Sequence, residues 1–239
     1  MRNSAGLFII TEPDKAVLLN AHNAYRQTSY NNRDTFLEKI SIPRGHRDCC
    51  DSKVYETAMR EFIEETGCFF DNAFIYKYPF ELKWEDDGVV YTYLIYVGMV
   101  RGNLNDVNAR PNTYTVKLLP GIVDNYYDII LKPRRFNCEI IRSLKIVPLN
   151  KYFQYMTNKQ LITYDSSNYL EFFEFVKTVK AKFDEKKFIN DNFLFVTLKK
   201  INDLRDHEHV QSLRSLQRPL FNTQRNMGCS KRDDQQEKT

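Results

Sequence analysis

The sequence predicts an α+β protein, in which strand-like and helix-like segments follow one another without a regular alternation. Two apolar strand-like runs open the chain, and a helix-like segment rich in carboxylates ends at Gly67. Strand-like runs return over residues 73–100, and a helix with an apolar stripe is expected over residues 169–184. Strands and helices mixed in this order favour a layered α+β domain over an all-helical or all-strand protein.

The first predicted elements are two strands near the N-terminus. Residues 5–10 and 16–19 are apolar, and residues 12–15 between them include Pro and Asp, which favour a turn. Residues 22–38 are polar and rich in Asn, Tyr and Arg. We expect this segment to form an irregular loop, which could lie over a functional site.

The segment from Arg60 to Gly67 carries the strongest functional signal. Glu61, Glu64 and Glu65 stand at i, i+3 and i+4, so at about 100° per residue they occupy roughly a third of the helix circumference. Like charges at this spacing repel by a few tenths of a kcal/mol, and a cation would remove that cost. Oxygen ligands suit Mg²⁺, Mn²⁺ or Ca²⁺ rather than zinc. Apolar residues share the adjacent face and can pack into a core: Tyr55, Met59, Phe62 and Ile63.

An acidic helix face is more often a solvated surface than a metal site. The segment that precedes the helix favours the metal site in this case. Residues 40–45 read as a short strand interrupted by Pro43 and Gly45. A polar loop then leads into the helix, with Asp51 or Ser52 as the expected N-cap. A strand, a Gly-containing loop and a carboxylate helix form a compact unit that can face one ligand.

These residues resemble the motif of the Nudix hydrolase family, which is Gly, five residues, Glu, seven residues, then Arg-Glu-apolar-x-Glu-Glu-x-Gly-apolar. Here Gly45 is followed by five residues and Asp51, then by eight residues and a full match from Arg60 to Cys68. The departures are Asp51 in place of Glu and one extra residue, which concern loop geometry more than metal binding. Residues 1–149 also resemble the Nudix proteins of baculoviruses, often described as ADP-ribose pyrophosphatase-like.

The resemblance implies an α/β/α sandwich with a mixed sheet, plus a C-terminal helical extension, and it implies the roles of the motif residues. Glu64 and Glu65 are then the principal ligands of Mg²⁺ or Mn²⁺. Glu61 is a further ligand or orients the attacking water, and Arg60 holds these carboxylates in position. The backbone carbonyl of Gly45 is another expected ligand.

Three further residues are weaker candidates for the same site. Family enzymes often recruit a downstream acidic residue, and Glu139 is our choice because it precedes a predicted strand. An ion pair of Glu139 with Arg134 or Arg142 is the alternative. Arg44 and His46 are the weaker candidates for contacts to substrate phosphate, and a loop histidine without a catalytic role is the default interpretation of His46.

The later elements are less sharply defined. Residues 73–84 and 89–100 read as one hairpin, because Asp-Gly between them favours a primed turn. Residues 101–137 look like mixed loops with a basic run at 132–135, and residues 139–149 resemble a closing strand. Ser166 or Ser167 is the expected cap of the last helix, whose apolar stripe has four members: Leu170, Phe173, Val176 and Phe183.

The length of 239 residues suits one domain with an extension. We expect a catalytic domain over 1–150, a helical extension packed on it over 151–201, and a polar, flexible tail over 202–239. Five cysteines without a Cys-x-x-Cys pair favour a reducing compartment over a disulfide framework or zinc site. No apolar run approaches the ~20 residues of a membrane span, so we expect a soluble, cytoplasmic protein (in the host cell if viral), possibly a homodimer.

The predicted function is metal-dependent hydrolysis of the diphosphate linkage in a nucleoside diphosphate joined to a group X. ADP-ribose is the first choice of substrate, although Pro79 comes too early to be the proline that ADP-ribose subfamilies carry beyond the motif. Hydrolysis of the 5′ cap of mRNA is the alternative, supported by Arg44, the basic run at 132–135 and the lysines between 177 and 187. A non-catalytic nucleotide-binding module is a third possibility, and the intact carboxylates argue against it.

Overall fold

The computed structural model describes the following residues: 4–21, 40–86, 88–102, 104–105, 107, 113–133, 142–160, 167–186 and 189–200. Several predictions fall outside them. The loop expected over 22–38, the candidate ligand Glu139, the candidate cap Ser166 and the tail expected over 202–239 are not among the described residues.

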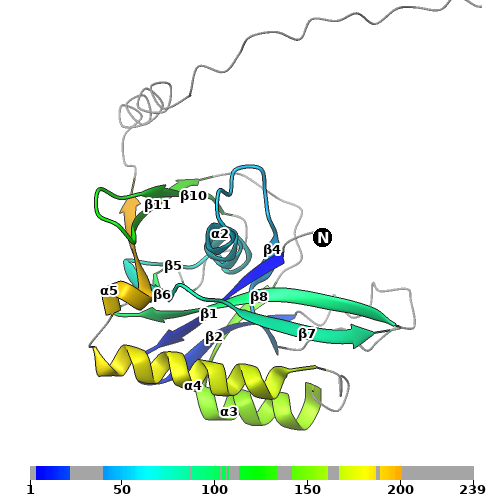
Figure 1. Cartoon of the computed structure of the whole chain (residues 1–239). Helices are drawn as coiled ribbons and strands as arrows, with labels where there is room; N and C mark the ends of the chain where they lie inside the picture. The colour runs from blue at the N-terminus through cyan, green and yellow to red at the C-terminus, as the bar shows by residue number, and fades with distance from the viewer. Residues whose placement is uncertain are drawn as a thin grey trace, which may run out of the picture. The chain divides into compact units, whose positions relative to one another are not determined.

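A mixed sheet forms the centre of the fold (Figure 1). Its main path among the described residues runs β10-β11-β13-β6-β8-β1-β2-β12, with β3 on β2, β4 on β1 and β7 on β8, and β5 and β9 form a separate pair. The strands are β1 (Ser4–Thr11), β2 (Lys15–Ala21), β3 (Ile40–Ser41), β4 (Arg44–His46), β5 (Phe69–Phe70), β6 (Asn72–Tyr76), β7 (Phe80–Asp86), β8 (Val89–Val100), β9 (Leu104–Asn105), β10 (Tyr114–Pro120), β11 (Tyr126–Pro133), β12 (Arg142–Pro148) and β13 (Phe193–Lys200).

Strand β1 organises both faces of this sheet. It pairs in parallel with β8 along its length, and it pairs antiparallel with β4 at its start and with β2 at its end. Successive side chains of a strand point to opposite faces. Leu7 and Ile9 accordingly join one apolar cluster, and Phe8 and Ile10 join the other.

Helices cover the two faces of the sheet (Figure 1). The cluster with Leu7 contains the apolar face of α2 (Val54–Thr66), as predicted, and the cluster with Phe8 contains residues of α3 (Leu149–Tyr155) and α4 (Tyr169–Glu185). The helices of the described residues also include the short elements η2 (Met156–Gln160) and α5 (Ile189–Asn192). The predicted α/β/α sandwich is therefore confirmed. None of the helices in the described ranges is long and apolar enough to cross a membrane.

Helix α2 ends where the sequence predicts and begins differently. Gly67 adopts a left-handed conformation with φ of 69°, and its N–H donates to the carbonyl of Ile63, which is the usual use of Gly after a helix. The N-cap is Lys53, without a side-chain cap bond, so the prediction of Asp51 or Ser52 as the cap is wrong. Instead, the Glu56 carboxylate accepts the backbone N–H of Ser52 at 2.7 Å.

Two sequence-based assignments differ from the structure in the strands. The run at 73–84 is two strands, β6 and β7, separated near Pro79, and only β7 forms the predicted hairpin with β8. Residues 101–137, expected to be loops, contain the antiparallel pair β10 and β11. These two strands pair with each other across a short turn, and β11 also pairs with β13, which is distant in the chain. Strand propensity depends on such neighbours, so the local pattern gave little sign of them.

The C-terminal extension is only partly helical. Helix α4 is found where predicted, but its N-cap is Asn168 and Leu170 is 57% exposed instead of buried. After α4 the chain enters the sheet as β13, which lies between β11 and β6. Residues 193–200 therefore belong to the central sheet, and the expected boundary at residue 150 does not separate them from it.

Candidate active site

The carboxylate face of α2 lies against β4, and Gly45 is the point of closest approach. A Cβ atom placed on Gly45 would lie 2.2 Å from the carboxyl carbon of Glu61. Any side chain at this position would therefore occupy the space of the carboxylate. This contact explains why the motif has Gly at position 45. Because Gly has no side chain, Glu61 can reach the β4 backbone.

Arg60 connects the carboxylates to the loop before the helix. Its Nη1 donates to Glu61 at 2.8 Å and to Glu64 at 2.9 Å. Its Nη2 donates to the carbonyl of His46 at 2.9 Å and to Asp51 at 2.8 Å. Burial opposes the charge of Arg60, but the hydrogen bond to Asp51 and the charge of Glu61 outweigh it and raise the pKa of Arg60. Arg60 is thus a permanent cation that fixes the directions of two carboxylates.

Asp51 is the motif residue whose contacts the sequence did not reveal. It is 7% exposed, and besides Arg60 it accepts the hydroxyl of Thr57 and the backbone N–H of Asp48, both at 3.0 Å. Burial would raise the pKa of Asp51, but the hydrogen bond from Arg60 lowers it below its ordinary value. The available signal was its place in the motif, which has an acidic residue eight positions before the arginine, whereas Asp51 lies nine positions before Arg60. The shorter side chain still reaches the arginine.

Glu65 and Arg44 form a second contact between α2 and β4. The backbone N–H of Arg44 donates to the Glu65 carboxylate at 2.9 Å. The guanidinium of Arg44 lies 4.9 Å from the ring centroid of Tyr93, an arrangement that favours a cation over an aromatic face. The side chain of Arg44 therefore packs against Tyr93, a residue that the sequence analysis had not identified as part of the site.

His46 contributes through its backbone as well as its ring. Its carbonyl accepts Arg60, and its Nδ1 lies 2.6 Å from the hydroxyl of Ser4. The side chain is exposed at the end of β4. The structure thus places His46 at the rim of the carboxylate face, in contact with the first residue of β1.

Burial makes the charge on the carboxylate face costly. The pKa of Glu61 is raised to about 7, first by burial and then by the neighbouring charges of Glu65 and Glu64, although Arg60 acts to lower it. A single guanidinium therefore does not compensate the cluster fully. An additional cation at this face would remove the remaining repulsion.

The donor set fits a hard divalent cation. Carboxylates on one helix face, beside a backbone from which a Cβ is excluded, supply oxygen ligands of the kind that Mg²⁺ and Mn²⁺ bind. In the described ranges no group of three acidic, His or Cys side chains is arranged to hold a metal ion. The carboxylates already accept hydrogen bonds: Arg60 donates to Glu61 and Glu64, and the backbone N–H of Arg44 donates to Glu65. Each of these carboxylates would have to share or exchange a hydrogen bond to bind a metal.

Comparison with known proteins identifies the family. The chain is 68% identical over 221 residues to a protein named ADP-ribose pyrophosphatase ORF38 from Autographa californica nuclear polyhedrosis virus, a match that covers 91% of this chain and 100% of the relative. The chain belongs to the Nudix hydrolase family. The family predicted from the sequence is thereby confirmed, and the protein is a hydrolase.

Two other comparisons accompany this one. The Nudix chain is 64% identical over 202 residues to an uncharacterized 24.3 kDa protein of Orgyia pseudotsugata multicapsid polyhedrosis virus, covering 84% of this chain and 94% of the relative. Among solved structures it is similar to a NUDIX hydrolase from Nitrosomonas europaea, with 16% identity, a TM-score of 0.38, and coverage of 65% of this chain and 78% of that one. No family model matches the chain.

Proposed function

We propose that this Nudix hydrolase is a divalent-metal-dependent pyrophosphohydrolase that cleaves the diphosphate linkage of ADP-ribose. The observation that carries the proposal is the carboxylate face of α2, held against Gly45 by Arg60. The choice of substrate is supported by the printed name of the 68% identical baculovirus relative, an ADP-ribose pyrophosphatase. The motif and the relative thus support the reaction and the substrate separately.

Glu61, Glu64 and Glu65, with the backbone carbonyl of Gly45, are the groups that would hold Mg²⁺ or Mn²⁺. When bound, such a cation offsets charge on the phosphoryl oxygens and lowers the pKa of water. Arg60 keeps Glu61 and Glu64 on the same side of α2, with hydrogen bonds of 2.8 and 2.9 Å that would be shared or exchanged when a cation binds. Glu61 is either a ligand itself or the residue that orients the attacking water.

Three side chains complete the proposed site. Arg44 reaches α2 through its backbone N–H, while its guanidinium lies against Tyr93 and is our proposal for a contact to substrate phosphate. His46, at the rim, is in position to contact the same group. Glu139 remains our proposal for the downstream acidic ligand.

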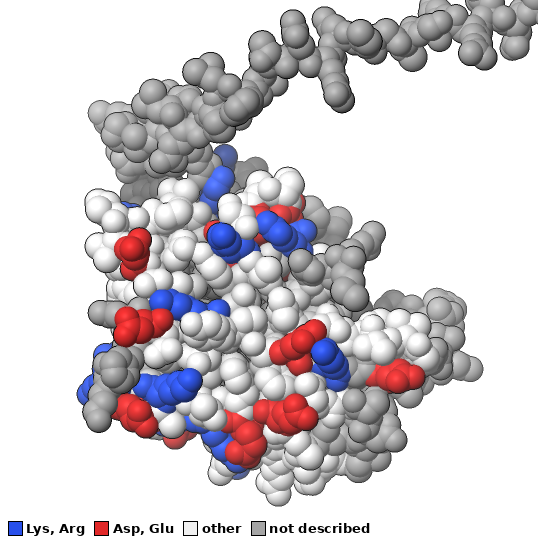
Figure 2. All heavy atoms as spheres, in the orientation of Figure 1, with Lys and Arg blue, Asp and Glu red and all other residues white. Residues whose placement is uncertain are grey.

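Two of the lysines that would support binding of capped RNA form ion pairs in the structure. Lys177 pairs with Glu174 at 2.6 Å, and Lys180 pairs with Asp184 at 2.6 Å. On the face in Figure 2, the described basic side chains are interspersed with acidic ones. Such a mixed face gives little of the phosphate neutralisation that drives binding to RNA, which favours a small nucleotide as substrate.

The deciding experiment incubates the full chain with ADP-ribose, a diadenosine polyphosphate and capped RNA, with Mg²⁺, with Mn²⁺ and with chelator, and resolves the products. We expect AMP and ribose 5-phosphate from ADP-ribose only when metal is present. Release of the cap nucleotide without cleavage of ADP-ribose would replace the proposed substrate. Binding of nucleotide without any cleavage would favour a non-catalytic module.

A matched pair of variants tests the site. Glu65→Gln keeps the shape of the side chain and removes one ligand charge, so turnover should fall by about 100-fold or more while the melting temperature is maintained. Glu174→Gln makes the same chemical change at an exposed residue of α4 and should leave turnover unchanged. Equal turnover in the two variants would mean that the metal is held elsewhere.

A further inference from the structure

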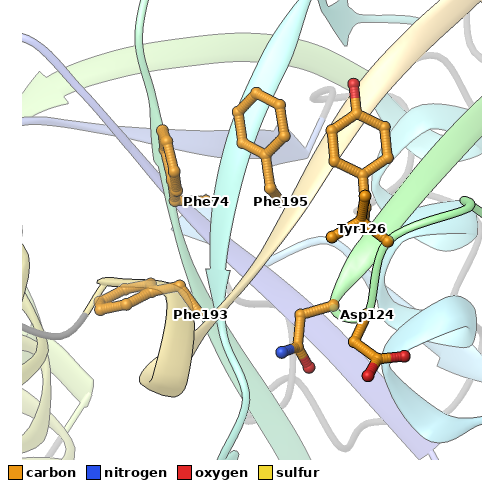
Figure 3. Close-up of a pocket in the computed structure, with 7 residues that line it drawn as sticks. Phe74, Asp124, Tyr126, Phe193 and Phe195 are labelled. Atoms are coloured by element: carbon orange, nitrogen blue, oxygen red, sulfur yellow. The ribbon is translucent and has the colours of Figure 1, made fainter.

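A pocket of about 350 Å³ opens at the edge of the sheet near the β10–β11 turn (Figure 3). Aromatic rings and two polar residues of the turn line it: Phe74, Asp124, Asn125, Tyr126, Phe193 and Phe195. None of the proposed hydrolytic residues contributes to this lining. The pocket is therefore a separate candidate for binding.

The pocket lies on the face of the sheet opposite α2. Leu194 and Val196 of β13 belong to the apolar cluster under α2, whereas Phe193 belongs to the cluster under α4. Because side chains alternate along a strand, Phe195 points to the same side as Phe193. A ligand in this pocket is consequently separated by the sheet from the carboxylates of α2.

The aromatic lining forms a platform that is already in place. The ring centroid of Phe195 lies 4.8 Å from that of Phe74 and 5.2 Å from that of Tyr126. Thr197 donates its hydroxyl to the Tyr126 hydroxyl, which holds that ring. Phe193 is 2% exposed, while Phe195 is only half-buried. The aromatic lining thus combines one buried ring, Phe193, with the partly exposed ring of Phe195, which a planar ligand can cover.

The polar residues that line the pocket, Asp124 and Asn125, offer acceptor oxygens, the Asn125 amide also donates, and neither residue carries a positive charge. Asp124 and Asn125 are exposed in the turn, and the turn is fixed because the carbonyl of Asn125 accepts the N–H of Phe195 at 2.8 Å. Further along the same face, Asp128 is buried; Lys199 binds its Oδ2 at 2.7 Å, and its Oδ1 has no hydrogen-bond partner within the described ranges. These groups favour a ligand that donates hydrogen bonds and brings no negative charge into the pocket.

We propose that this pocket binds a purine base. A purine is planar, stacks on aromatic side chains, and presents N–H donors at its edge that the carboxylate of Asp124 and the amide of Asn125 can accept. The volume is at the lower end of small-ligand sites, which suits a base better than a complete dinucleotide. The phosphates of such a ligand would lie outside the pocket.

The base can come from a free nucleoside or nucleotide, or from one residue of an RNA strand, and both share this recognition chemistry. It is not the base of the molecule being hydrolysed, because the sheet separates the pocket from the α2 carboxylates. The proposal does not rest on hydrolytic activity, and it can be tested on the metal-free protein.

The test measures binding to the full chain by calorimetry, in chelator, with adenosine, guanosine, cytidine and a short purine RNA. We expect the purine nucleosides to bind more tightly than cytidine. Phe195→Leu, which removes the ring at similar volume, should weaken purine binding roughly 5- to 150-fold, as stacking on an aromatic residue predicts. Asp124→Ala should weaken it as well. Ile122→Ala changes a fully exposed residue of the same turn, outside the lining, and should leave the affinity unchanged.

The ligand source follows from the relative affinities: an RNA that binds more tightly than its nucleoside, with the same sensitivity to both variants, indicates a strand. Equal affinities indicate a free nucleoside or nucleotide. If Phe195→Leu does not fold, Asp124→Ala decides, because that side chain is exposed and its loss leaves the packing intact. Absence of purine binding to the wild-type protein, or purine binding that Asp124→Ala leaves unchanged, overturns the proposal.

Discussion

The two faces of the central sheet are packed by different means. Under α2, the guanidinium of Arg60 lies among carboxylates and is 7% exposed, as is its partner Asp51. Under α4, aromatic rings pack on one another, with the Phe8 ring centroid 5.5 Å from those of both Phe172 and Tyr152. Both faces carry an apolar cluster that stabilises the fold, but the α2 face also holds charges that are costly to bury.

This difference teaches that the chemistry is confined to one face, whereas stability depends on both. Removing a ring under α4 deletes buried contacts and leaves the carboxylates untouched. Moving a carboxylate under α2 changes the site but removes little apolar surface. Substitutions on the two faces should therefore affect different measurements, and the predictions below test that separation.

The largest expected effect is that of Phe172→Ala on the α4 face. Phe172 is fully buried against Phe8 and Phe80, so its loss should lower the free energy of unfolding by about 3–5 kcal/mol. Denaturant unfolding measures this change. At temperatures where the variant is folded, its metal dependence of hydrolysis should equal that of the wild type, and a changed metal dependence would break the comparison.

Gly45→Ala should lower turnover by roughly 100-fold, because misplacement of a catalytic group by about 1 Å has this effect. The new Cβ would occupy the position of the Glu61 carboxylate. That carboxylate is the far end of a flexible side chain, so it can move and the melting temperature should change little. Steady-state kinetics with thermal unfolding distinguish the two effects, and Ser41→Ala in β3 is the control. Full activity in Gly45→Ala would show that Glu61 need not lie against β4.

Asp51→Asn should lower the free energy of unfolding by about 2 kcal/mol at neutral pH, because a buried hydrogen bond between charged groups is lost. The native pKa of Asp51 is lowered, so its contribution is complete above the ordinary Asp pKa of about 4 and is lost as the pH falls through the lower native value. The difference between wild type and variant should therefore shrink in acid. A difference that is constant from pH 7 down to pH 2 would contradict the charged pair.

The smallest expected effect is that of Lys177→Ala. This side chain is 60% exposed and pairs with a Glu174 side chain that is 72% exposed, and exposed pairs contribute about 0.5 kcal/mol or less. Neither the melting temperature nor the salt dependence of substrate affinity should change measurably. A large loss of RNA affinity in this variant would instead revive the decapping alternative.

Local sequence patterns correctly predicted the elements that depend on neighbouring residues. The first two strands, the end of α2 at Gly67 and the extent of α4 follow from apolar spacing and turn residues. The strands β10, β11 and β13 were missed. Strand β13 pairs with β11 and β6, both distant in the chain, whereas β10 pairs with β11, which follows it directly. Strand propensity depends on such neighbours more than helix propensity does.

The sequence by itself determined the family and the group of carboxylates, since the spacing of Glu61, Glu64 and Glu65 on one helix face is a local property. Only the tertiary structure decided what those carboxylates contact. Asp51 read as a helix cap, yet it binds Arg60, because the loop folds back and brings the two together. The aromatic pocket likewise joins β6, β11 and β13. Contacts between segments so far apart arise from the pairing of strands, which no spacing along the chain encodes.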